Sequence, residues 1–165
     1  MEKVEDSVMA EKPKPKNEGL FANGFGVRIV LQGVMFAALT LIAFFIGCDC
    51  DWSAISTFTP NDPRLLHGET MAFLVLAMCQ IVQSYNMRSD KSLFKIGFFG
   101  NKTLNLSALA AFVLTAAVAT IPGVRDAFGL VLLNPTQYLI CLGLVLVPLV
   151  VMEVVKLIGR LRSEK

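Results

Sequence analysis

Four long apolar segments, separated by charged connections, constrain this chain more than any other feature of its sequence. A helix that crosses the bilayer core of about 30 Å needs about 20 residues. Segments of that length lie at about residues 29–47, 70–87, 104–121 and 137–158. They hold almost no charged residues, and a charge at the bilayer centre costs roughly 2.5–3.5 kcal/mol even on the mildest scale. The pattern therefore predicts an all-α fold: an integral membrane bundle of four transmembrane helices.

Composition supports the same interpretation and excludes two others. Hydrophobic residues make up 55% of the chain and the mean hydropathy is +0.62, which is too apolar for an ordinary soluble domain. The net charge of +2 gives no reason to expect a nucleic-acid partner, because nucleic-acid binders carry a strongly basic face. The expected surroundings are a lipid bilayer, and the expected location is a cell membrane crossed several times.

The basic residues predict the orientation of the four spans. Of 15 lysines and arginines, 13 lie in the N-terminal segment, in the connection between the second and third spans, or at the C-terminus. Because basic residues resist translocation, we expect both termini to be cytoplasmic. The predicted organisation is a cytoplasmic segment 1–28, a membrane domain 29–158 and a cytoplasmic tail 159–165.

Small residues predict where the helices approach one another. Close packing of small side chains drives helix association in lipid, and Gly33 and Ala37 lie four apart on the first span. Pro148 lacks a backbone N–H and should bend the last span near Leu144. The third span carries a longer series of small residues: Ser107, Ala111, Thr115 and Ala119.

Two cysteines after the first span raise the possibility of redox chemistry. Cys48 and Cys50 flank Asp49 in a predicted external connection, as in a four-helix thiol-oxidising membrane enzyme. Such an enzyme needs a second external pair to pass electrons by thiol–disulfide exchange, and a one-residue spacing makes an unstrained disulfide difficult. The favoured interpretation is a pair of ordinary loop thiols, and His67 is interpreted as a surface histidine rather than a metal ligand.

Polar residues within the spans are the other candidates for function. Gln80, Gln83 and Ser84 are three and four residues apart, so they should share one side of the second span. Their spacing favours hydrogen bonds between helices over cation binding, since a carboxamide oxygen is a weaker cation ligand than a carboxylate. Glu153 and Lys156 should pair near the end of the last span and reach the headgroups.

Catalytic motifs are absent from the sequence. It contains no Gly-rich phosphate-binding loop and no nucleophile elbow. We therefore expect no catalytic residue, no bound cofactor and no ATP hydrolysis by this chain alone.

Several motifs resemble one family, the calcium-transporting P-type ATPases. The runs Thr70–Phe73 and Tyr85–Ser89, followed by 91–97 and Asn101-Lys102, resemble the eighth membrane helix of these pumps and its following loop. Two further stretches also resemble the family. The opening, with Asp6, Met9, Lys12-Pro13, Gly19–Phe21 and Gln32-Gly33, is similar to the approach to the seventh helix, and Pro148–Val150 with Glu153–Lys156 is similar to the tenth.

The resemblance implies that the four spans are helices seven to ten of a ten-helix pump. The phosphorylated aspartate and most ion ligands of that family would lie upstream, so calcium and Mg-ATP would act on the parent protein, and the remaining helices and cytoplasmic domains of the pump would be the partners of this chain. Family members that bind two calcium ions carry an acidic residue where Gln80 stands, so Gln80 is a possible weak cation-site position, with Gln83 supporting it. The alternative is a self-contained four-helix membrane thiol oxidoreductase or small carrier.

Overall fold

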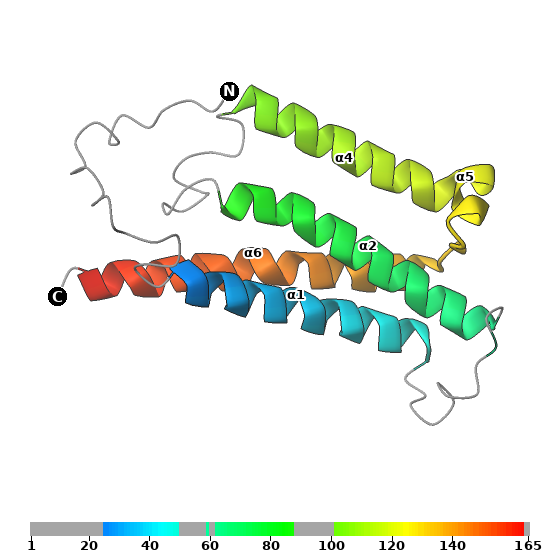
Figure 1. The fold of residues 1–165 in the computed structure, drawn as a ribbon, viewed down its shortest axis with the longest axis horizontal. Helices are drawn as coiled ribbons and strands as arrows, with labels where there is room; N and C mark the ends of the chain where they lie inside the picture. Colours follow the sequence, from blue (N-terminus) through cyan, green and yellow to red (C-terminus); the bar gives the residue numbers. More distant parts are fainter. Residues whose placement is uncertain (1–24, 50–58, 60–61, 88–100, 164–165) are drawn as a thin grey trace.

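A computed structural model describes residues 25–49, 59, 62–87 and 101–163 of the chain (Figure 1). The described residues form five helices: α1 (Phe25–Gly47), α2 (Pro63–Asn86), α4 (Lys102–Thr120), the short α5 (Pro122–Ala127) and α6 (Pro135–Ser163). Four of them are long and apolar enough to cross a membrane. The predicted all-α architecture with four long apolar helices is therefore confirmed, while the orientation of the termini stays a prediction. Residues 1–24 of the predicted segment 1–28, and residues 88–100 between the second and third spans, lie outside the described residues.

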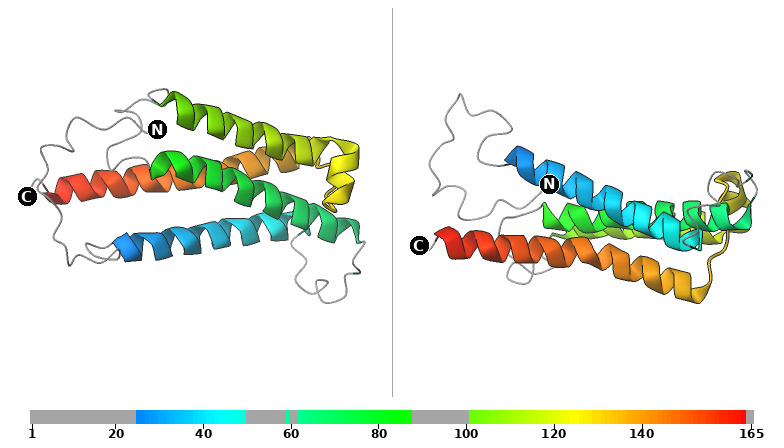
Figure 2. Two further views of the ribbon diagram at one scale, coloured as in Figure 1. Left: turned by 45° about the horizontal axis from the view of Figure 1, so that its top comes forward. Right: turned by 90° about the horizontal axis from the view of Figure 1, so that it is seen from below.

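The helices run side by side, and α2 lies between α1 and α4 (Figures 1 and 2). α2 contacts each of the other three long helices, and α1 also contacts α6. α1 begins and α6 ends at the same end of the bundle, which we call the terminal end. The opposite end, which holds the start of α2 and all of α5, is called the distal end.

Local sequence signals explain where the helices begin. Asp62 caps α2, since its Oδ1 accepts a hydrogen bond from the Arg64 backbone N–H at 2.9 Å, and Pro63 follows at the first helical position, where the lack of an N–H costs nothing. Asn101 caps α4 through bonds from the N–H groups of Thr103 and Leu104, both 3.1 Å. α2 consequently begins before the predicted membrane segment 70–87.

α5 was not expected from hydropathy, because it is a single short turn. It starts at Pro122 and ends at Ala127. Gly129, two residues later, has a φ of 68°, which is readily adopted only by glycine. The N–H groups of Gly129 and Leu130 donate to the carbonyls of Asp126 and Arg125, the pattern of a Schellman cap. This cap turns the chain from α4 back toward α6.

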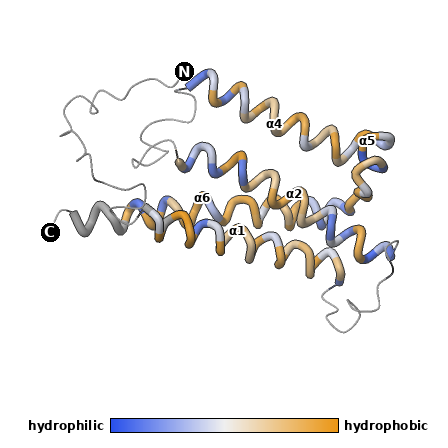
Figure 3. Tube along the Cα trace, viewed as in Figure 1, coloured by the Kyte–Doolittle hydropathy of each residue, from blue (hydrophilic) through white to orange (hydrophobic). Residues whose placement is uncertain are grey.

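The core of the bundle lies around α2. Met71, Val75 and Cys79 are almost fully buried there, against Leu39 and Ala43 of α1. One third of the most apolar stretch of α2 is buried, compared with 11% for α4. Exposed large apolar residues nevertheless run along α1, α4 and α6, whereas α2 exposes one, Leu76. Figure 3 shows the hydropathy along each helix. The bundle therefore leaves wide apolar faces for lipid or further helices to cover.

The predicted close approach through Gly33 and Ala37 is wrong within this bundle. Both residues are exposed, and a Cβ added to Gly33 would meet no atom within 4 Å. The close approach instead lies at the distal end, where a Cβ on Gly47 would stand 2.5 Å from the Cα of Gly68. The small residues of α4 pack only partly, since Ala119 is buried and Ser107 is exposed.

Candidate functional site

The exposed side of α2 carries the first candidate site residue, Gln80. Leu76, Gln80, Ser84 and Met87 are all exposed and follow one another at helical spacing. The hydroxyl of Ser84 donates to the Ile81 carbonyl of its own helix at 2.7 Å. Gln80 therefore points away from the helices that pack against α2. Exposing a carboxamide to lipid costs free energy, and a polar partner from outside the bundle would reduce that cost.

Gln83 differs from its two neighbours in the predicted polar group. It is half-buried, and its Oε1 is buried with no hydrogen-bond partner among the described residues. Gln83 is displaced from Gln80 by three residues, or about 60° around a helix of 3.6 residues per turn. The predicted polar side of α2 is thus divided: Gln80 and Ser84 are exposed, while the amide oxygen of Gln83 is inside.

Asn86, the last residue of α2, is the most buried polar side chain at this level. Its exposed fraction is 0%, and its Nδ2 donates to the Pro148 carbonyl of α6 at 3.5 Å. Its Oδ1 has no partner among the described residues. The sequence held a signal for this burial, because Asn86 lies seven residues after the buried Cys79 and so on the same side of the helix.

Two further polar contacts hold the terminal half of α6. Gln32 of α1 donates from Nε2 to the Met152 sulfur at 3.1 Å, although the residues are 120 positions apart. Lys156 and Glu153 form the predicted pair at 4.0 Å. The expectation that Lys156 extends to the headgroups is not met, because its side chain is 3% exposed and lies on the buried side of α6.

Cys48 differs from the loop thiol that the sequence predicted. This residue is fully buried rather than an open loop thiol, because its sulfur fits against Gly68 of α2. Burial raises the pKa of the Cys48 thiol, and the nearby carboxylates of Asp49, Glu69 and Asp62 raise it further. A high pKa and a covered sulfur both reduce nucleophilic reactivity, which weighs against the thiol oxidoreductase alternative. Cys50 lies outside the described residues.

His67 makes a local contact within α2. Its Nδ1 lies 2.6 Å from the Pro63 carbonyl in the first turn of α2. Among the described residues, no group of three or more His, Cys, Asp and Glu side chains could hold a metal ion.

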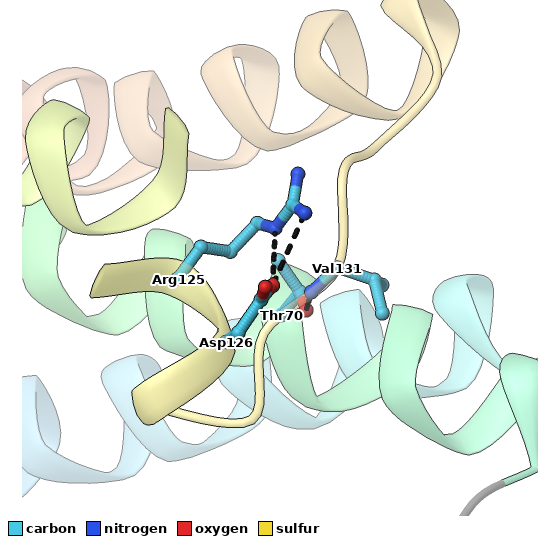
Figure 4. A network of polar contacts seen from close by, with 4 residues as sticks. All are labelled: Thr70, Arg125, Asp126 and Val131. Atoms are coloured by element: carbon cyan, nitrogen blue, oxygen red, sulfur yellow. Dashed lines mark hydrogen bonds and ion pairs between the residues drawn. The ribbon is translucent and has the colours of Figure 1, made fainter. Parts of the chain in front are cut away.

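A polar network fixes the connection between α5 and α6 at the distal end (Figure 4). The Thr70 hydroxyl donates to the Leu66 carbonyl at 2.7 Å and accepts a bond from the Val131 N–H at 3.0 Å. Arg125 pairs with Asp126 at 3.1 Å beside it. Thr70 is completely buried, so this network orders the connection rather than forming an open site.

Comparison with known proteins relates this chain to cation-transporting ATPases. The family model described as cation transporting ATPase, C-terminus, matches residues 1–158. A calcium-transporting ATPase 1 of Bacillus cereus is 37% identical over 156 residues, covering 91% of this chain and 18% of that protein. A calcium-transporting ATPase of Listeria monocytogenes is 31% identical over 160 residues, covering 96% of this chain and 17% of that protein.

A third relative, a calcium-transporting ATPase of Bacillus subtilis, is 27% identical over 148 residues, which are 90% of this chain and 16% of that protein. The chain thus spans about a sixth of the length of these curated relatives. With a family match over 158 of 165 residues and four helices suited to a membrane, the chain belongs to the family of C-terminal domains of cation-transporting ATPases.

Proposed function

We propose that this chain is the C-terminal membrane module of a P-type pump for calcium and that both its ends face the cytoplasm. The names of the relatives support calcium as the cargo, and the distribution of basic residues supports the orientation. The module supports the ion-binding helices of the pump and takes no part in ATP hydrolysis. Its partners are the bilayer, the other membrane helices and the cytoplasmic domains of the same pump.

The observation that carries this proposal is the exposure of Gln80 on α2. α2 is the central helix of the bundle, yet its one exposed carboxamide faces away from α1, α4 and α6. A side chain of this kind gains most when another helix supplies a polar partner or a shared ion. The remaining membrane helices of a pump, packed on this face, would meet that requirement.

Gln80 is assigned the role of a neutral oxygen ligand at the edge of the ion site. Calcium takes about six to eight oxygen ligands, and its affinity depends on how many of them are charged. A carboxamide at this position adds no charge, so a second calcium site that needs a carboxylate here would be weak. The proposed pump therefore moves one calcium ion per cycle, and Gln83 supports α2 from its inner side.

Gln80→Leu in the full-length pump that carries this sequence tests the ligand role. We expect the apparent calcium affinity of ATP hydrolysis to fall about tenfold, equivalent to about 1.4 kcal/mol, with normal yield and thermal stability. The matched control is Ser84→Leu, one turn away on the same exposed side, which should leave calcium affinity unchanged. Reduced stability with unchanged affinity in Gln80→Leu would show that Gln80 only joins helices.

A further inference from the structure

The strongest unexplained feature of the bundle is a pair of buried oxygen atoms, Gln83 Oε1 and Asn86 Oδ1. Neither has a hydrogen-bond partner among the described residues. A buried carbonyl oxygen without a donor costs about 1–3 kcal/mol, so such groups in native structures are normally satisfied by protein or by ordered water. The two residues are three apart on α2, which places them on neighbouring positions of one helix surface.

The orientation of the Asn86 amide is fixed by its surroundings. Its Nδ2 donates to the Pro148 carbonyl, and rotating the amide by 180° would bring two acceptor oxygens together instead. Oδ1 must therefore be the atom that lacks a partner. Both unpartnered atoms, as they are placed, are acceptors, so the group that satisfies them is a donor.

α6 adds a backbone acceptor one turn before the Pro148 carbonyl that Asn86 contacts. Pro148 lies inside this helix and has no N–H to donate to the Leu144 carbonyl. Pro148 is itself fully buried, so bulk water does not reach this part of the helix surface. The end of α2 thus carries two unpartnered side-chain oxygens, and α6, which Asn86 contacts, carries a backbone carbonyl that has lost its helical donor.

Two side-chain donors among the described residues at this end of the bundle are engaged elsewhere. The Gln32 amide donates to the Met152 sulfur. The Lys156 ammonium, on the same side of α6 as Pro148 and Met152, lies 4.0 Å from the Glu153 carboxylate. A water molecule supplies two O–H donors in a small volume, and buried waters typically make about three hydrogen bonds to such groups.

We propose that Gln83 and Asn86 hold an internal water molecule between the last turn of α2 and α6 beside Pro148. The water donates its two hydrogens to two of three acceptors, which are Gln83 Oε1, Asn86 Oδ1 and the Leu144 carbonyl. The water joins the end of α2 to α6 within the apolar bundle. This site is distinct from the exposed Gln80 side of α2 and does not depend on the proposed function.

Water-edited solid-state NMR of the isotope-labelled 165-residue chain in lipid bilayers tests the site. We expect magnetisation to pass from water to the Asn86 side-chain amide several-fold faster than to Val75, which is equally buried on the same helix but has only apolar side-chain atoms. Equal rates for Asn86 and Val75, whether both slow or both fast, would overturn the proposal.

A substitution and a change of salt complete the experiment. Asn86→Leu should abolish fast transfer from water to the Pro148 ring, whereas Ser84→Ala, on the exposed side of α2, should preserve it. Replacing sodium and potassium by choline at constant ionic strength should leave the wild-type transfer unchanged. Loss of the signal in choline would overturn the proposal in favour of a bound monovalent cation.

Discussion

Gly47→Ala is expected to separate α1 from α2 at the distal end and to destabilise the bundle by about 1–3 kcal/mol, the usual cost of overpacking. The added Cβ would lie 2.5 Å from the Gly68 Cα, 2.7 Å from the Gly68 nitrogen and 2.8 Å from the His67 carbonyl oxygen. All three atoms belong to the backbone, so no side-chain rotation relieves the overlap. Thermal unfolding of the purified chain in one detergent, followed by circular dichroism at helix wavelengths, measures the effect.

Gly33→Ala provides the matched control on the same helix. Its new Cβ meets nothing within 4 Å, and alanine is favoured over glycine in a helix by about 0.5–1 kcal/mol. The control should therefore unfold at the wild-type temperature or slightly above it. Equal unfolding temperatures for the two variants would contradict the assigned contact between α1 and α2.

Thr70→Val is expected to release the connection between α5 and α6 from α2. Valine preserves the shape of threonine but removes the hydroxyl that accepts the Val131 N–H at 3.0 Å. An unpartnered N–H in a half-buried connection costs about 1–3 kcal/mol. Hydrogen exchange should show loss of protection at the Val131 amide, together with a lower unfolding temperature.

Thr40→Val separates this effect from the general cost of replacing a threonine in a helix. Thr40 donates to the Phe36 carbonyl of its own helix at 2.8 Å, a local bond that adds little to helix stability. We expect its stability and the Val131 protection to match the wild type. Wild-type protection of Val131 in Thr70→Val would refute the role given to the Thr70 hydroxyl.

The sequence predicted the four long apolar helices because burial in lipid demands length and low charge, and both are visible residue by residue. It also predicted the Glu153–Lys156 pair from helical spacing. Hydropathy does not mark the start of α2, because the helix begins before its apolar stretch, although Asp62-Pro63 is a strong helix-start signal. Pro122 and Gly129 are likewise start and stop signals for α5. This helix is too short to appear in a hydropathy pattern.

The contacts between helices could not be read from one sequence. The Gly33 and Ala37 surface of α1 and the Gly47 position near its end are equally plausible places for a second helix to approach. The relative rotation of α1 and α2 decides between them, and it brings Gly47 against Gly68. The same rotation separates Gln83 from Gln80 and buries Cys48 instead of exposing it. The contact of Asn86 depends on the position of α6 against the end of α2, because its partner Pro148 is 62 residues away in the sequence.

The number of calcium ions bound per phosphoenzyme tests the central claim most directly. The measurement uses the full-length pump that carries this chain, with radioactive calcium binding and phosphoenzyme quantified on the same preparation. A neutral carboxamide at Gln80 predicts one calcium ion per phosphoenzyme, because the second site lacks its carboxylate from α2. A stoichiometry of two in the wild-type pump would contradict the account.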